Sequence, residues 1–124
     1  MKILDKFTAM LKSPPCMAPT GCHDRVRSGK ALLVDVREPA EWTGGVAQSA
    51  VLLPLSDLTG ARRQWQEFLG RAAGRELFLY CASGTRSGLA ARILTAEGFP
   101  VFNTGGLRDW AGSGWPVVRP GKKE

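Results

Sequence analysis

The 124-residue sequence lacks the long apolar run, of about 20 residues, that a membrane-spanning helix needs. It also lacks a signal-peptide pattern, because Asp5 and Lys6 interrupt the apolar residues near its start and no clear cleavage site follows. Its three cysteines cannot all pair within one chain, which predicts reduced thiols and, without a secretory signal, a cytoplasmic location. These absences argue against a membrane protein and against a disulfide-stabilised secreted domain.

The basic residues do not form a block. Lys and Arg number 17 against 11 Asp and Glu, a net charge of +6, but they are spread along the whole chain. Nucleic-acid-binding proteins usually gather such residues in a stripe. We therefore expect a basic solvated surface and no nucleic-acid partner. A small anionic substrate is compatible with this charge.

The residues that are present predict one α/β domain. The length suits a single domain, and the apolar fraction of 44% is ordinary for a globular protein. Apolar runs alternate with segments of helical character, which indicates a parallel sheet covered on both faces. Strands are predicted at 31–36, 50–53, 76–80 and 100–102, and helices or helical turns at 20–29, 37–43, 56–70, 87–97 and 107–111. The predicted organisation is an N-terminal helical extension (1–15), the domain itself (16–120) and a polar tail (121–124).

Cys81 comes directly after the predicted strand 76–80. It therefore lies at the carboxyl end of a parallel strand, where ligands bind in such folds. A small polar loop, 82–86, and a predicted helix follow it. Loop amides and a helix N-terminus together form a site for an anion, and the first anion there is the Cys81 thiolate. We therefore expect the pKa of Cys81 to lie below that of a free cysteine, with Gly84 allowing the tight turn and Arg86 adding positive charge.

Three segments resemble the rhodanese domain, a family of sulfurtransferases. They are VDVREPAEW (34–42), YCASGTRS (80–87) and NTGGLRDW (103–110), in the order and spacing of the family. The chain is most similar to single-domain rhodanese-like sulfurtransferases. The resemblance implies a three-layer α/β/α domain with a central parallel sheet.

The resemblance also implies the chemistry. Cys81 would take a sulfane sulfur from thiosulfate or a related persulfide donor and pass it, through a persulfide, to cyanide or a thiol. A protein sulfur acceptor is a further expected partner, whereas no cofactor or metal is expected. The residues expected to bind the donor are Ala82, Ser83, Gly84, Thr85, Arg86 and Ser87. Asp35 and Arg37 are expected to support the pocket or to form a purely structural ion-pair network, and Glu41 is expected to pair with Arg37 or Arg86.

The sequence leaves alternatives open. A cysteine phosphatase or arsenate reductase of related fold has its arginine six residues after the cysteine, whereas Arg86 is five residues after Cys81. A non-catalytic rhodanese-like redox or binding module is the other alternative. Val46 stands where the family usually has histidine, and Cys16 or Cys22 either relays sulfur or is incidental.

Overall fold

A computed structural model describes residues 16–120. The predicted helical extension at 1–15 and the polar tail at 121–124 lie outside the described residues. The main sheet is parallel throughout, in the strand order β3 (Val51–Leu52), β1 (Ala31–Asp35), β4 (Glu76–Cys81), β5 (Val101–Gly106). Cys16 adds one parallel bridge to Asn103, at the outer edge of β5.

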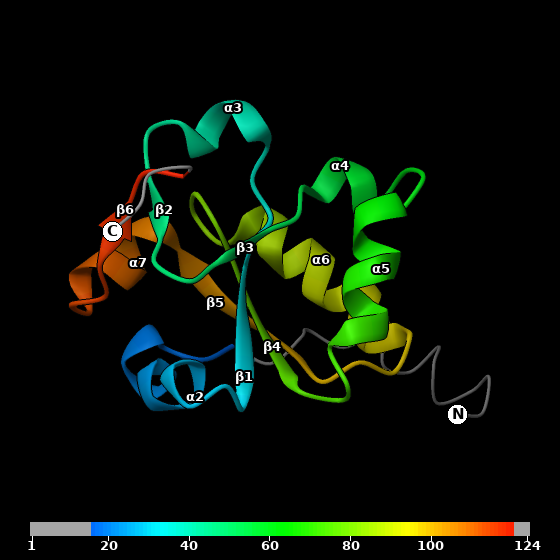
Figure 1. Ribbon diagram of the computed structural model, residues 1–124, viewed down its shortest axis with the longest axis horizontal. Coiled ribbons are helices and arrows are strands. Elements are labelled where there is room, and N and C mark those ends of the chain that lie inside the picture. The colour runs from blue at the N-terminus through cyan, green and yellow to red at the C-terminus, as the bar shows by residue number, and fades with distance from the viewer. Residues whose placement is uncertain (1–15, 121–124) are drawn as a thin grey trace.

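Helices cover both faces of the sheet (Figure 1). Successive side chains of β4 point to opposite faces, as in any strand. Leu77 and Leu79 belong to one buried cluster, and Phe78 and Tyr80 to the other. The first cluster lies under α4 (Leu55–Leu58), α5 (Arg63–Arg71) and α6 (Thr85–Ala96), and the second under α2 (His23–Arg27) and α7 (Leu107–Gly112). The predicted three-layer α/β/α fold with a central parallel sheet is confirmed.

The single helix predicted at 56–70 is wrong, because the chain forms two helices, α4 and α5, instead. The backbone turns between them, and Arg62 adopts a left-handed conformation with φ of 59°. The Asp57 carboxylate accepts hydrogen bonds from the first three amides of α5 at 2.9–3.0 Å. Asp57 thus provides acceptors for the free amides at the start of α5, so a new helix begins there instead of α4 continuing.

A second, two-stranded antiparallel sheet pairs β2 (Val46–Ala47) with β6 (Val117–Val118). No strand was predicted in either segment, since two residues are too few to show a periodicity. Val46, which stands where the resemblance implies a histidine, is buried in this sheet. The N-terminal helix is also shorter than the predicted 20–29, because a 3-10 turn, η1 (Pro19–Gly21), precedes α2.

Candidate active site

Cys81 is the last residue of β4, and its side chain lies beneath the turn that leads into α6. The register of β4 against β5 shifts between Leu79 and Cys81. The Cys81 Sγ accepts a hydrogen bond from the Gly84 amide at 3.0 Å and lies 3.4 Å from the Ser87 hydroxyl. The loop after the strand therefore surrounds the sulfur with donors, as the sequence predicts.

The hydrogen-bond donors around Sγ determine the acidity of the Cys81 thiol. Burial alone raises the pKa of Cys81, but the Ser87 hydroxyl and the amides of Ser87, Ser83 and Gly84 outweigh it, so the pKa lies below its ordinary value. Hydrogen bonds to the charged form favour that form. The expected direction of the shift agrees with the structure, and it makes Cys81 a stronger candidate nucleophile than an ordinary buried thiol.

Glycines let the loop approach the end of β5. Gly84 has φ of +100°, and a Cβ added there would lie 3.3 Å from the Cα of Gly105. A Cβ added at Gly106 would lie only 2.2 Å from the carbonyl oxygen of Ala82. The first residue of the loop and the end of β5 therefore pack backbone against backbone, with no room for a side chain at position 106.

Asn103 links the loop to β5 and was not singled out from the sequence, although it opens the NTGG segment of the resemblance. Its side-chain amide donates to the Gly84 carbonyl at 3.0 Å, and its Oδ1 accepts from the Gly105 amide at 3.1 Å. The same Oδ1 lies 2.8 Å from the Ser87 hydroxyl. The Gly105 carbonyl, at 3.4 Å, is a third acceptor, and because Ser87 has one hydroxyl proton, Asn103, Gly105 and the Cys81 sulfur compete for it.

Arg86 does not stand free beside the sulfur. Its guanidinium binds both carboxylate oxygens of Glu41, at 2.5 and 2.8 Å. Glu41 comes from the short helix α3 (Pro39–Trp42), which lies beyond the carboxyl ends of the strands (Figure 1). Hydrogen bonding from Arg86 lowers the pKa of Glu41 to about 2. The choice between Arg37 and Arg86 as partner of the Glu41 side chain is thus settled in favour of Arg86.

Asp35 and Arg37 form a separate, buried network. The Arg37 guanidinium binds the Asp35 carboxylate at 2.8 Å and the Gly45 carbonyl at 2.6 Å. The Tyr80 hydroxyl donates to Asp35 at 2.7 Å, and the Trp42 indole donates to it at 3.2 Å. Asp35 is fully buried and Arg37 is 7% exposed. These contacts tie α3, which carries Glu41, to the end of β1.

The remaining loop residues differ in exposure. Ala82, Ser83 and Thr85 are exposed, Gly84 and Arg86 are half-buried, and Ser87 is buried. Within residues 16–120, no three His, Cys, Asp or Glu side chains are placed to hold a metal ion. In the same range no helix has the length and apolar character to cross a membrane.

Neither of the other two cysteines lies next to Cys81. Cys16 pairs with Asn103, which pairs with Leu79, so two strand spacings of about 4.8 Å put Cys16 roughly 10 Å from β4. A disulfide needs Cα atoms within about 7 Å. Cys22 is buried in the cluster on the opposite face of the sheet, where burial raises its pKa to about 11. A direct relay between either thiol and Cys81 would require the backbone to move.

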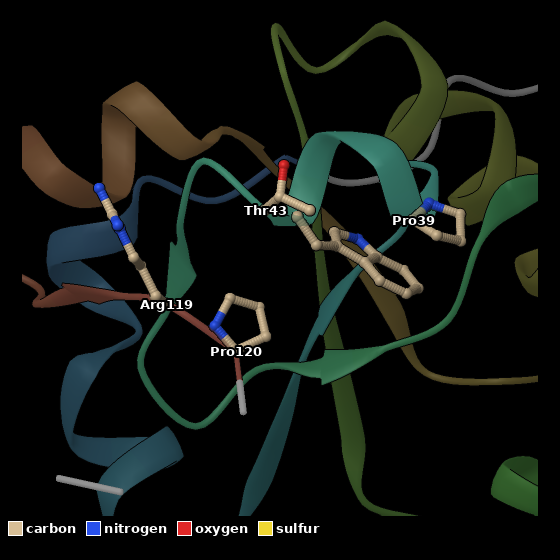
Figure 2. A pocket seen from close by; sticks show the side chains of 5 residues that line it. Pro39, Thr43, Arg119 and Pro120 are labelled. Carbon is tan, nitrogen blue, oxygen red and sulfur yellow. The ribbon is translucent and has the colours of Figure 1, made fainter. Parts of the chain in front are cut away.

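Two surface pockets lie near the Cys81 loop and α3. Figure 2 shows one, of about 340 Å³, in which Pro39 and Thr43 lie across from Arg119 and Pro120. It contains no residue of the Cys81 loop. The other, of about 510 Å³, runs beside the loop along α6, and its lining residues are Cys16, Gly84, Thr85, Gly88, Leu89, Arg92 and Asn103.

Most of the chain matches a known protein family. The model of the rhodanese-like domain matches residues 18–113 of this chain. The chain belongs to the rhodanese-like domain family. The loop of Cys81 and the segment around Asn103 both lie inside the matched range, so the site described above is the cysteine loop of a rhodanese-like domain.

Three proteins illustrate the similarity of this rhodanese-like domain to others. It is 35% identical over 105 residues to the uncharacterized protein slr1261 of Synechocystis sp., a match that covers 83% of this chain but only 55% of that protein. It is 35% identical over 91 residues to a protein named sulfurtransferase from Allochromatium vinosum, covering 72% of this chain and 79% of that protein. The crystal structure of a rhodanese-related protein from Thermoplasma volcanium superposes with a TM-score of 0.69 at 28% identity, covering 84% of this chain and 97% of that one.

Proposed function

We propose that this rhodanese-like domain is a sulfurtransferase in which Cys81 carries a sulfane sulfur as a persulfide. The observation that carries the proposal is the environment of the Cys81 sulfur, which is 3.0 Å from the Gly84 amide and has a lowered pKa. Membership of the family, and similarity to the Allochromatium vinosum sulfurtransferase, support a sulfurtransferase-type enzyme. The donor is thiosulfate or a related persulfide, and the acceptor is cyanide or a thiol, including a thiol on a protein.

In the first half-reaction the Cys81 thiolate attacks the outer, sulfane sulfur of thiosulfate. A bond forms between Sγ and that sulfur, the sulfur–sulfur bond of thiosulfate breaks, and sulfite leaves with the electron pair. A thiolate needs no general base, and the loop donors that lower the pKa of Cys81 favour the thiolate. This agrees with the position of the sole histidine, His23, which stacks on Trp110 in the other helical layer.

In the second half-reaction the acceptor attacks the terminal sulfur of the persulfide. Cyanide leaves as thiocyanate, or a thiolate leaves as a new persulfide, and Cys81 returns to the thiolate. The loop amides that lower the pKa of Cys81 would also stabilise the persulfide anion, since they are fixed hydrogen-bond donors that point towards the negative charge. The buried network of Asp35 and Arg37 would keep α3 and Glu41 in place during both steps.

The test is the intact mass of the protein after incubation with thiosulfate and, separately, with glutathione persulfide. We expect the gain of one sulfur atom, removed by cyanide with release of thiocyanate. Cys81→Ser is expected to gain none. Cys22→Ser is the matched control, because Cys22 is equally buried but has a raised pKa of about 11, and it should still gain sulfur.

Two results would overturn the proposal. One is the absence of any sulfur gain with either donor, and the other is an undiminished gain in Cys81→Ser. Turnover of an aryl phosphate or of arsenate, lost in Cys81→Ser, would instead support the phosphatase or arsenate reductase alternative.

A further inference from the structure

The charge balance around Cys81 differs from that of the whole chain. The protein carries a net charge of +6, which draws anions towards its surface. Beside the loop, however, the Arg86 guanidinium is bound through both of its terminal nitrogens to the Glu41 carboxylate. A paired guanidinium presents little net charge to an approaching anion. An anionic reagent that approaches Cys81 therefore meets the backbone amides of the loop rather than the uncompensated charge of Arg86.

A second carboxylate lies on the same side. Glu38 is the N-cap residue of α3, three residues before Glu41, and contributes with Glu41 to the raised pKa of Arg86. Its own oxygens accept hydrogen bonds from the hydroxyl and amide of Ser56, at 2.6 and 3.2 Å. Two carboxylates thus face one guanidinium, and the side chains of α3 and the loop together add negative rather than positive charge.

Arg92, the other arginine of α6, does not change this balance on the α3 side of the loop. Arg92 lies six residues after Arg86, about 9 Å further along the helix, and lines the groove beside Cys16 rather than the α3 side of the loop. At physiological salt this separation from Arg86 is about one screening length, so Arg92 adds little to the charge on the α3 side of the loop.

We propose that Glu41 is a specificity-determining residue, which cancels the charge of Arg86 and so favours a sulfur donor of low charge, a persulfide on an organic thiol, over dianionic thiosulfate. This choice of donor rests on the proposed sulfurtransferase function. The transfer is balanced: Cys81 attacks the terminal sulfur of the persulfide, the carrier's sulfur–sulfur bond breaks, and the carrier leaves as a thiolate. The proton of the carried sulfur passes to that thiolate or to water.

Glu41→Gln tests the role of the charge with little change of shape. The Gln amide oxygen can still accept from Arg86 and from the Glu38 amide, which Glu41 now binds at 3.1 Å. The matched control is Glu97→Gln. Glu97 forms an equivalent pair with Arg62 at 2.8 Å, but it stands at the other end of α6, about 16 Å along the helix axis from Arg86.

The first measurement is the rate of alkylation of Cys81 by iodoacetate and by iodoacetamide, in a Cys16→Ser background that removes the exposed thiol. The two reagents differ by one negative charge and react with the same thiolate, so their rate ratio is independent of the pKa of Cys81. We expect Glu41→Gln to raise the ratio of iodoacetate to iodoacetamide at least about threefold, an effect that shrinks at high salt. Glu97→Gln should leave the ratio at the wild-type value.

The second measurement compares kcat/KM for thiosulfate and for 2-hydroxyethyl persulfide. In Glu41→Gln the preference should move towards thiosulfate by a similar factor. An unchanged alkylation ratio, or an equal change in Glu97→Gln, would overturn the proposed role of Glu41, as would a wild-type preference for thiosulfate that Glu41→Gln does not alter. Failure of the wild type to transfer sulfur from any donor would overturn the proposed function instead, and the alkylation ratio would still decide the role of Glu41.

Discussion

Cys22 and Cys81 are both buried, yet their thiols differ in acidity. Burial, with Glu76 nearby, raises the pKa of Cys22 to about 11. Burial also acts against the thiolate of Cys81, but the Ser87 hydroxyl and three loop amides reverse the direction of the shift. Hydrogen-bond donors fixed around a sulfur therefore matter more here than exclusion from water.

Ser87→Ala is expected to raise the pKa of Cys81, because it removes the hydroxyl while leaving the loop amides in place. The measurement is the rate of reaction with iodoacetamide against pH in a Cys16→Ser background, with the midpoint moving to higher pH. Ser83→Ala is the matched control, since the Ser83 hydroxyl contacts Thr85 and not the sulfur. Equal midpoints in Ser87→Ala and the parent would contradict the assignment.

Because of Glu41, the free energy of unfolding of the protein should depend on pH in the acidic range. Its pKa in the folded state, about 2, lies below its ordinary value of 4.5, so the ion pair stabilises the folded state fully above pH 4.5. That contribution is lost as the pH falls from 4.5 towards 2. The free energies of unfolding of the wild type and Glu41→Gln, measured in urea, should therefore differ at neutral pH and converge across this window. A difference that stays constant down to pH 2 would refute the pairing.

At the scale of elements, the site is formed where three chain segments meet. The loop after β4 supplies Cys81, the end of β5 supplies Asn103 and the closely packed glycines, and α3 supplies Glu41. The close approach of β5 to the loop depends on Gly106, whose missing side chain leaves space for the Ala82 carbonyl. The loop geometry is thus determined partly by a neighbouring strand.

Gly106→Ala is expected to displace the start of the loop, because its Cβ would meet the Ala82 carbonyl oxygen at 2.2 Å. Displacing the amides from the sulfur should raise the pKa of Cys81 and lower the rate of sulfur transfer by about tenfold to a hundredfold. Gly112→Ala, at the end of α7 with nothing within 4 Å of its Cβ, should retain the wild-type rate. Wild-type kinetics in Gly106→Ala would show that the loop tolerates the displacement.

At the scale of the whole molecule, Tyr80 connects parts of the fold that are distant in sequence. It points from β4 into the cluster opposite Cys81, donates to Asp35 at the end of β1, and accepts from the Ala47 amide of β2 at 2.9 Å. Burial beside Asp35 raises the pKa of the Tyr80 hydroxyl, which stays protonated and able to donate. One side chain thereby joins the main sheet to the small β2–β6 sheet.

Tyr80→Phe is expected to destabilise the protein by about 1–3 kcal/mol, because the buried Ala47 amide loses its acceptor and Asp35 keeps Arg37 but loses one of its donors. Urea denaturation measures the loss. The pKa of Cys81, on the other face of the sheet, should not change. A stability equal to that of the wild type would mean that these groups find other partners.

The sequence by itself determined the alternation of strands and helices that builds the main sheet, the parallel direction of its strands and the position of Cys81 at a strand end. These features follow from local patterns: apolar runs such as 76–80, and small polar residues between a strand and a helix. The loop length of five residues from Cys81 to Arg86 is also a local property. The direction of the pKa shift of Cys81 could be predicted for the same reason, since its donors lie within six residues of it.

Only the tertiary structure decided which residues meet across long separations. Glu41 and Arg86 are 45 positions apart, and no pattern in the sequence distinguishes Arg86 from Arg37 as the partner of the Glu41 side chain. Ser87 and Asn103 are 16 positions apart and meet because β5 lies next to β4 in the sheet. The break between α4 and α5 likewise depends on where the Asp57 carboxylate finds free amides. Such contacts are set by the packing of whole elements, and they also set the charge beside Cys81.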